Sequence, residues 1–595
     1  MSTPTTAVAH DVERGHHHDQ RPGLLGRIAL ASARHRRRVI LTWAVLTLVA
    51  APLAVTLTGA LSGAGWEAQG SASQQVRDEL RRDFAALGAE AAYVVYQQTD
   101  PISQDHPGLS ALVAALAQAP AAASVVDPLT LPAEAGLIAR DGRTALIPVA
   151  LRGEVDADLP ESAAALSDAV AAVTLPAGAT ADVTGEWPVW ADFNQTNEEA
   201  LHKAELLSGL PTILLLLFAF GSVVAAGLPL ILAVAGIAVG FASLHLIGLQ
   251  MPVSVWAMNF SMMIGLAVGI DYSLFIVSRY REERAEGASE EDGVVNTLAT
   301  SGKAVFLSAL TVVFSLAAVF VVPVMVFRSM ALGMILAVIA VAAAALTLLP
   351  AVLVALGDRV VRTRHNKHPH GTDDPDIAAE SRWARVTAWA LRRPGRTLGL
   401  GVGLLLVVAA PALGMRLGMP GARVVDEGRS SRDGYDTMVQ AFGPGAAAPM
   451  FVTVSAGEAQ AVVDSAAGVG GVVDARIVSE PAASGRLVVR IIGSAAVDDP
   501  ATADLVEQLR DRVGAVAPSA QVGGPASQNH DLTSVLTGRA PLAIGIILVV
   551  AFLLLLVVFR SLVIAVFSIA DEPAHAWPRR SASPRSCSST ASAPD

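Results

Sequence analysis

Long apolar runs and two long polar segments divide this chain of 595 residues. A helix needs about 20 apolar residues to cross a bilayer. Runs of this kind predict spans near 39–60, 205–221, 224–248, 254–278, 303–323, 329–356, 397–416 and 540–559, and residues 561–570 resemble the start of one more. The pattern therefore predicts an α-helical polytopic membrane protein with two large segments outside the bilayer.

The same pattern divides the chain into regions. We expect a cytoplasmic N-terminal tail over 1–38, a first span over 39–60, a first outer domain over 61–203, spans two to six over 204–356, a cytoplasmic linker over 357–395, a seventh span over 396–416, a second outer domain over 417–538, an eighth span with the start of a ninth over 539–570, and an aberrant, disordered tail over 571–595.

Positive charge sets the expected orientation, because short loops rich in Lys and Arg stay on the cytoplasmic side. Residues 34–38 place the N-terminus inside, and Arg279, Arg281 and Arg284 place the loop after the fourth span inside. Segment 61–203 holds 20 acidic and 7 basic residues, a bias that fits an outer domain. We therefore expect a multi-pass protein of the inner (cytoplasmic) membrane with both outer domains outside.

The two outer segments have the same predicted order of elements. The first predicts strands at 91–96, 122–128, 144–151 and 180–185 with helices at 109–119 and 161–173. The second predicts strands at 450–454, 471–479, 486–492 and 521–524 with helices at 458–467 and 502–513. This β-α-β-β-α-β order is that of a ferredoxin-like α+β unit. One span, an outer domain and a block of spans occur twice, which predicts an internal repeat whose second copy is incomplete.

The membrane pattern stops abruptly after Ile569. Asp571, Glu572 and Pro573 break the helix, and the tail is rich in Ser, Ala, Arg and Pro. One hypothesis is a shift of reading frame near Ala570, which would make this chain a truncation product. The alternative is a short protein with a disordered tail.

Composition narrows the functional classes. The chain is 53% hydrophobic and 16% charged, against about a quarter charged in soluble domains. Its net charge of −11 argues against nucleic-acid binding, and a single cysteine, Cys587, excludes a disulfide framework. His16, His17 and His18 form either a weak metal site or, more simply, part of a disordered tail. No phosphate-binding loop, metal cluster or paired nucleophile and base is visible, so we expect no ATP, no cofactor and no enzyme.

One carboxylate falls inside a predicted span. Asp271 lies in the fourth span beside Tyr272. A charge inside the bilayer is costly and therefore usually functional, and a desolvated carboxyl can load and release protons. The pair predicts a proton relay, and the alternative is a structural Asp hydrogen-bonded within the bundle.

Other residues near this pair could support it. Gly265 and Gly269 form a small-x-x-x-small motif for helix packing, and Phe275 follows on the same helix. Hydroxyls at Ser308, Thr311 and Ser315 form one polar stripe on the fifth span, where they could bond Asp271 or only their own helix. The charged residues Arg279, Arg281, Glu282, Glu283 and Arg284 are interpreted as a solvated helix end.

Three aromatic residues precede the second span. Trp187, Trp190 and Phe193 either line a path for lipid or anchor the interface, and anchoring is the simpler interpretation.

These motifs resemble those of a known family. Residues 269–282, with Asp271, Tyr272 and Phe275, are similar to the fourth-helix motif of MMPL transporters of the RND superfamily. Residues 302–311 resemble their fifth helix and residues 559–562 the end of their eighth. The resemblance covers about 25–570. Two departures are Phe220-Gly221-Ser222, where the corresponding end of the eighth span has Arg560, and the lack of a counterpart to the family's tenth helix.

The resemblance implies a twelve-helix fold with two ferredoxin-like porter domains. It also implies export of lipids or other hydrophobic molecules driven by proton influx, with Asp271 and Tyr272 as the first of two relay pairs. The second pair is expected on a helix that this sequence lacks, so missing second-half helices or a partner subunit would have to supply it. The alternative is a membrane-anchored protein that binds a partner or lipid without transporting it.

Overall fold

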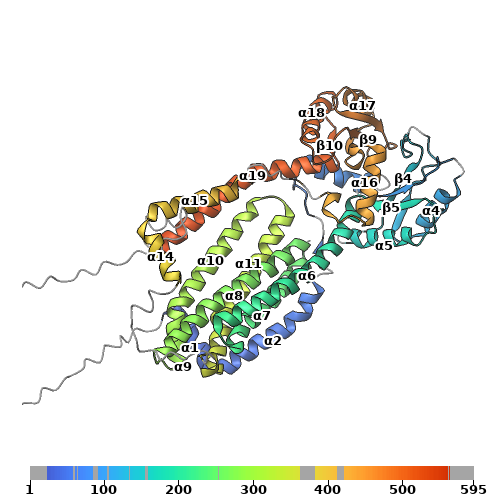
Figure 1. Cartoon of the computed structure of the whole chain (residues 1–595). Helices are drawn as coiled ribbons and strands as arrows, with labels where there is room; N and C mark the ends of the chain where they lie inside the picture. Colours follow the sequence, from blue (N-terminus) through green and yellow to red (C-terminus); the bar gives the residue numbers. More distant parts are fainter. Residues whose placement is uncertain are drawn as a thin grey trace, which may run out of the picture.

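The structure is a computed structural model with a membrane bundle at one end and two α/β units at the other (Figure 1). It describes residues 23–57, 61–62, 65–84, 91–103, 106–132, 135–153, 158–251, 253–361, 382–411, 418, 421–559 and 562. Apart from residue 562, the predicted ninth-span start lies outside these residues, as do the tail over 571–595 and His16, His17 and His18.

Six helical segments of the described chain are long and apolar enough to cross a bilayer. They are Arg36–Thr56 (α2), Val223–Gly248 (α7), Val255–Ala285 (α8), Glu290–Val321 (α9, Glu290–Thr297, to α10, Lys303–Ala317), Met325–Leu356 (α11) and Pro525–Val558 within α19, Pro525–Phe559. Two shorter apolar segments are Leu206–Phe220, at the end of α6 (Glu186–Phe220), and Pro394–Ala409 (α15). All eight coincide with predicted spans, so the prediction of a multi-pass helical membrane protein is confirmed.

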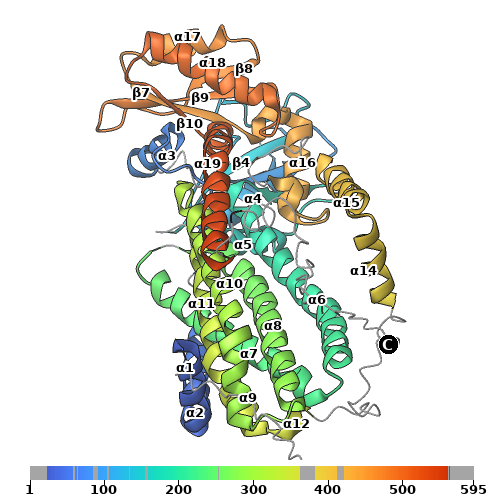
Figure 2. The same ribbon diagram turned by 90° about the vertical axis from the view of Figure 1, so that its left-hand side faces the viewer.

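The centre of the bundle is formed by α7, α8 and α11. Residues from these helices make one buried cluster that includes Leu232, Val277 and Val341. In the most apolar stretch of 18 residues, 50% of α7 and 56% of α11 is buried, compared with 6% of α2 and of α19. The helices at the edge therefore expose apolar side chains in the way expected of surfaces that contact lipid. Figure 2 shows the central helices in a view turned by 90°.

The first α/β unit consists of β2 (Ala91–Gln97), α4 (Pro107–Gln118), β3 (Ala122–Val125), β4 (Thr144–Leu151), α5 (Leu159–Ala171) and β5 (Thr180–Thr184). The second consists of β7 (Met450–Ser455), α17 (Ala459–Ala467), β8 (Val472–Ile477), β9 (Arg486–Gly493), α18 (Pro500–Val516) and β10 (Gln521–Gly523). The sheets have the orders β3-β4-β2-β5 and β8-β9-β7-β10, with antiparallel pairs throughout. Both units thus place their second, third, first and fourth strands side by side, in that order.

Each sheet is covered on both faces, although its own two helices cover only one. In β2, Val94 and Tyr96 pack in the cluster that contains α4 and α5, whereas Val95 points the other way. Side chains alternate along a strand, so a second element must cover the face of Val95. That element is α16 (Ser430–Phe442), whose Met438 packs beside Val95.

The second sheet is completed from the first half of the chain. Helix α3 (Ala72–Asp83) precedes the first unit in sequence, yet its Val76 and Leu80 pack against Phe451 and Val488 of β7 and β9. Neither α3 nor α16 was predicted from the sequence. The two units therefore exchange one helix each: α3 is given by the first half and α16 by the second.

A glycine links each sheet to a long helix. Gly185 follows β5 with φ 124° and Gly524 follows β10 with φ 91°. A Cβ at Gly524 would lie 2.5 Å from the carbonyl oxygen of Pro449, so a side chain does not fit there. The helices that follow, α6 and α19, have 35 residues each and run from the α/β units along the bundle (Figure 1).

Candidate functional site

Asp271 and Tyr272 lie about midway along α8 but face different surroundings. Asp271 is exposed in the described structure, whereas the Tyr272 side chain is only 3% exposed. Successive residues of a helix are about 100° apart, so the two side chains flank the edge where α8 meets its neighbours. The carboxylate therefore lies on a face of α8 that the described helices leave uncovered.

The Tyr272 hydroxyl has no hydrogen-bond partner of ordinary geometry within the described residues. Ser308 of α10 lies near this hydroxyl without an ordinary hydrogen bond to it, and Asp271 precedes Tyr272 on α8. A buried hydroxyl without a partner is uncommon, because an unmade hydrogen bond costs about 1–3 kcal/mol. The Tyr272 hydroxyl is therefore a buried donor and acceptor whose hydrogen bonds the described residues do not supply.

The three hydroxyls of the predicted polar stripe differ. Ser308 is exposed and is the one of the three that lies near the Tyr272 hydroxyl. Thr311 is half-buried and donates to the carbonyl oxygen of Leu307 at 2.8 Å, which is the local alternative considered from the sequence. Ser315 is half-buried further along α10. The structure therefore brings only Ser308 to the Asp271–Tyr272 pair.

Gly265 and Gly269 form the contact between α8 and α7. A Cβ at Gly265 would lie 2.7 Å from Ile237, and one at Gly269 would lie 2.8 Å from the Cβ of Ala233. Both distances are shorter than a side chain tolerates, so the two helices approach each other at these glycines. Phe275 takes no part in this contact: it is 57% exposed and lies on another side of α8.

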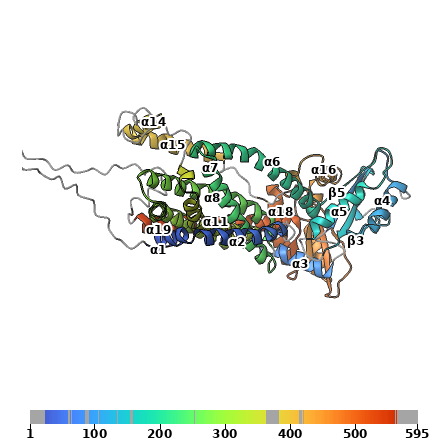
Figure 3. The same cartoon turned by 90° about the horizontal axis from the view of Figure 1, so that it is seen from below.

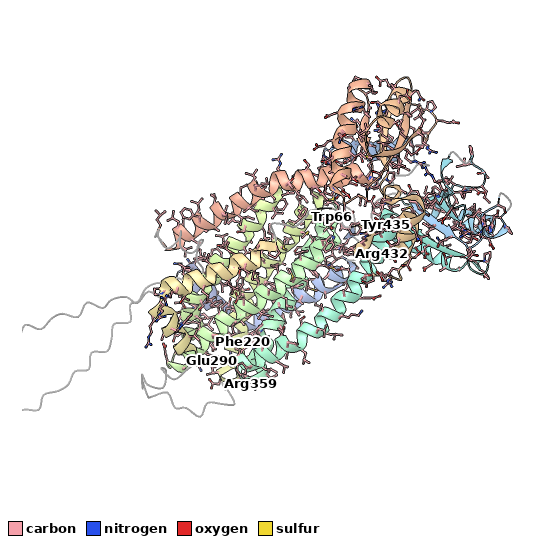
Figure 4. All side chains as sticks on the ribbon, turned by 45° about the horizontal axis from the view of Figure 1, so that its top comes forward. Trp66, Phe220, Glu290, Arg359, Arg432 and Tyr435 are labelled. Carbon is pink, nitrogen blue, oxygen red and sulfur yellow. The ribbon has the colours of Figure 1, made fainter. Side chains whose placement is uncertain are left out.

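The end of α8 corrects one interpretation from the sequence, because Arg281 is not a solvated residue. Its guanidinium donates to the carbonyl oxygens of Phe220 at 2.8 Å and of Val360 at 2.8 and 2.9 Å. It also lies 5.4 Å from the ring centroid of Phe220. Arg281 thereby holds together the ends of α6, α8 and α12 (Asp358–Val361), where Figure 4 labels Phe220.

The charged residues next to Arg281 are only partly solvated. Glu282 is exposed, as predicted, but Glu283 is buried and binds Arg279 and Asn296. Arg284 pairs with Asp358 at 2.8 Å.

A cavity of about 150 Å³ lies between the two α/β units, above the membrane bundle. Its lining comes from both units and from the exchanged helices α3 and α16. The lining includes Arg77, Leu80, Tyr93, Glu186, Trp190, Tyr435, Met438, Phe451 and Gln528. Most of these side chains are apolar or aromatic, as in sites for small organic molecules. Figure 4 labels Tyr435 and Trp66 where the units meet the bundle.

Arg77 lines this cavity as a buried cation and is 4% exposed. It pairs with Glu67 at 2.5 Å and with Glu186 at the start of α6. With the Gln528 side-chain oxygen turned toward Arg77, this oxygen accepts from Arg77 Nε at 2.8 Å. A buried cation with two carboxylates joins α3, α6 and α19 at one point. No local sequence signal indicated this cluster, because Arg77 and Gln528 lie 451 positions apart.

An aromatic cluster lies between the cavity and the bundle. Trp66 stacks on Trp190 at 6.2 Å between ring centroids and meets Trp256 and Phe327 edge-on. Phe193 contacts Trp190 at 5.6 Å. Trp187, by contrast, is fully buried in the core of the first sheet. Of the three aromatics noted in the sequence, Trp190 and Phe193 therefore join the units to the bundle, and Trp190 also lines the cavity.

Comparison with known proteins decides the family. The model of the MMPL family matches residues 65–397 and 430–570. This chain belongs to the MMPL family. The described helices therefore belong to a member of the MMPL family, as the fourth-helix motif indicated.

Three relatives illustrate the similarity of this MMPL chain to known members. A Streptomyces coelicolor membrane protein is 32% identical over 92% of this chain and 75% of its own length. The heme uptake protein MmpL11 of Mycobacterium tuberculosis is 31% identical over 89% of this chain and 56% of its own. The mycolic acid-containing lipids exporter MmpL11 of Mycolicibacterium smegmatis is 30% identical over 91% and 58%. The chain thus spans a little over half the length of the MmpL11 proteins.

Proposed function

We propose that this MMPL protein moves lipids or other hydrophobic molecules across the cytoplasmic membrane, driven by proton influx through Asp271 and Tyr272. The observation that carries the proposal is the exposed carboxylate midway along α8, beside a buried hydroxyl with no ordinary partner. A carboxyl in the bilayer is costly unless it is used, and proton loading is the use that an adjacent phenol supports.

The route of the substrate follows from the two α/β units. We infer that they are ferredoxin-like porter domains of an RND-type repeat and that the cavity between them holds the substrate after it leaves the bilayer. An apolar and aromatic lining suits acyl chains, and the Arg77 cluster offers charged groups for a polar head. The relatives named as lipid exporter and heme uptake protein both handle large, mainly apolar molecules, which supports this class of substrate.

Transport and proton coupling can be tested together in proteoliposomes. The full chain is reconstituted with a fluorescent glycolipid, a pH gradient is imposed, and movement of the glycolipid between leaflets is measured. We expect gradient-dependent movement that Asp271→Asn abolishes and that Glu282→Gln, a matched change at the exposed end of α8, leaves intact. Equal movement in wild type and Asp271→Asn would overturn the relay.

The second candidate, a binding or scaffold protein without transport, predicts a different result. The glycolipid would then bind the wild-type chain in detergent but would not move in response to the gradient.

The proposed orientation, with the N-terminus cytoplasmic and the units outside, has its own test. In a chain with Cys587→Ser, a membrane-impermeant maleimide should label Ser110→Cys of α4 in intact cells but not Ser289→Cys. Labelling of Ser289→Cys but not of Ser110→Cys would show that the orientation is the reverse of the one proposed.

A further inference from the structure

Two short helices at the membrane end of the molecule lead into membrane helices through arginine-rich corners. Helix α1 (Leu24–Arg34) meets α2 at His35, and α14 (Arg382–Arg392) meets α15 at Arg393. Both short helices have 11 residues. Figures 1 and 3 place α1 and α14 at the same end of the bundle, the end opposite the α/β units.

The backbone turns both corners in the same way. The carbonyl oxygen of His35 accepts from the amides of Arg38 and Val39, and that of Arg393 accepts from the amides of Arg396 and Thr397. In each case the acceptor is three and four positions before the donors. The Thr397 hydroxyl adds a further bond to Arg393 at 3.2 Å. Each corner residue is therefore the N-cap of the membrane helix that follows it.

Each corner concentrates positive charge. Residues 24–38 contain five arginines and residues 382–396 contain five, with no Asp or Glu in either stretch. The side chains of Arg34, Arg36, Arg37, Arg38, Arg392, Arg393 and Arg396 are all exposed. None of these seven forms an ion pair with the described part of the chain, unlike Arg279 and Arg284 at the same end. The corners thus offer guanidinium groups that have no ion-pair partner among the described residues, in a chain whose net charge is −11.

The level of the corners in the bilayer can be estimated from the membrane helices that start there. Helix α2 has 21 residues and is about 31 Å long, close to the thickness of the hydrocarbon layer. Arg36 at its first position therefore lies at the level of the phosphates when α2 spans the bilayer. Helix α15 is shorter, with 16 residues, but Arg393 and Arg396 likewise lie at its start.

Helix α14 needs a partner that the described bundle does not provide. Val386, Trp389 and Leu391 are 55–56% exposed, and among the described elements α14 packs chiefly on α15. Helix α1 differs, because its small residues Gly26 and Ala29 pack on the bundle. An amphipathic helix with exposed Trp, Val and Leu beside arginines is suited to lie in the headgroup region of a bilayer.

We propose that the two corners bind the phosphate groups of anionic phospholipids in the leaflet away from the α/β units. The guanidinium of Arg matches a phosphate with two parallel hydrogen bonds, and each arginine near an anionic surface strengthens binding about fivefold. The α14 corner is the stronger candidate because its apolar side chains also enter the headgroup layer. These arginines could instead serve only to orient the helices in the membrane, and that role requires no preference for one lipid over another. A measured preference for anionic lipid therefore distinguishes lipid binding from orientation alone.

The experiment measures lipid preference directly. The full chain is reconstituted in dioleoylphosphatidylcholine with spin-labelled phosphatidylglycerol or spin-labelled phosphatidylcholine, and the motionally restricted fraction of each lipid is compared by electron paramagnetic resonance. We expect several-fold preference for phosphatidylglycerol, weakened by salt. The triple variant Arg392→Gln, Arg393→Gln and Arg396→Gln should lose most of it, and the matching lysine variant should recover part.

The matched control removes three exposed arginines from the α/β units: Arg140→Gln, Arg143→Gln and Arg512→Gln. This variant should keep the wild-type preference. The proposal is overturned if the wild type restricts both lipids equally, if the α14 variant keeps the full preference, or if the control loses as much as the corner variant. Because Arg392, Arg393 and Arg396 are exposed and α14 packs chiefly on α15, the corner variant should retain the thermal midpoint of the wild type.

Discussion

The Ser73 hydroxyl donates a 2.7 Å hydrogen bond to the carboxylate of Asp531, which lies 458 positions further along the chain. The same carboxylate accepts from Arg510 of α18 at 2.6 and 2.8 Å. Asp531 is 8% exposed, so both bonds are shielded from water. This carboxylate therefore fastens the exchanged helix α3 to the unit built from the second half of the chain.

Asp531→Asn should loosen that attachment. The change removes the charge that Arg510 faces and one acceptor of α3, at a cost of about 1–3 kcal/mol. We expect a lower thermal midpoint in detergent and faster amide hydrogen exchange in α3 than in the wild type. Asp511→Asn, an exposed change on α18, is the control and should alter neither. Unchanged exchange in α3 would contradict the attachment.

Gly269→Ala should destabilise the bundle, whereas Gly227→Ala should not. The new methyl at position 269 would lie 2.8 Å from Ala233, and overpacking of this kind costs about 1–3 kcal/mol. A methyl at position 227 of α7 meets no atom within 4 Å, and alanine favours a helix by up to about 1 kcal/mol. Thermal midpoints of the two variants should shift in opposite directions, and equal shifts would show that the α7–α8 approach is not tight.

Arg281→Gln should separate the ends of three helices. Its three hydrogen bonds to Phe220 and Val360 come from a charged donor, and their loss should cost about 1.5–3 kcal/mol. Arg281→Lys should recover little, because an ammonium group cannot reach both carbonyls in the same plane. Arg279→Gln removes only pairs within α8 and serves as the control. A midpoint for Arg281→Gln equal to that of Arg279→Gln would argue against the clamp.

Asp182→Asn should stabilise the junction of β5 and α16 at neutral pH. Burial raises the pKa of Asp182 above its usual value of about 3.9, opposed by a hydrogen bond from Ser430 and aided by Asp433. The raised pKa means that the ionised form is disfavoured in the folded protein, so stability from this group is full below pH 4 and falls as pH rises through the folded pKa.

The gain in thermal midpoint should therefore be near zero at pH 4 and reach roughly 1–3 °C at pH 7. Asp168→Asn, an exposed change on α5, should show no such trend. A gain that is the same at both pH values would rule out titration of Asp182 as the cause.

The elements with a clear local pattern of apolar residues could be predicted from the sequence. The predicted spans overlap all eight apolar segments, and the eight strands of the two sheets were placed within a few residues, because runs of 20 apolar residues and short alternating stretches are local patterns. The helical segments Glu290–Val321 and Pro525–Val558 begin well before their predicted spans, in polar sequence. The helices α3 and α16 were missed. Their sequences are polar on average, and what holds them is a sheet face from the other half of the chain.

The candidate site shows the same limit. Asp271 stands out because a charge is rare within an apolar run, and Gly265 and Gly269 stand out by their spacing. Arg281 could not be distinguished from Arg279 in sequence, since its partners Phe220 and Val360 are 61 and 79 positions away. Likewise, the charges around Arg77 meet only after α3 has crossed to the second unit.

The exchange of helices also sets an order of events during synthesis. Val183 of β5 donates to the hydroxyl of Ser430, which the ribosome adds 247 positions later. At about 5–20 residues per second, the first sheet waits on the order of 10–50 s with the face of Val95 and Leu146 uncovered. During that interval the nascent first unit has an apolar surface that a chaperone or the bilayer itself must shield, and it matures only when the second half arrives.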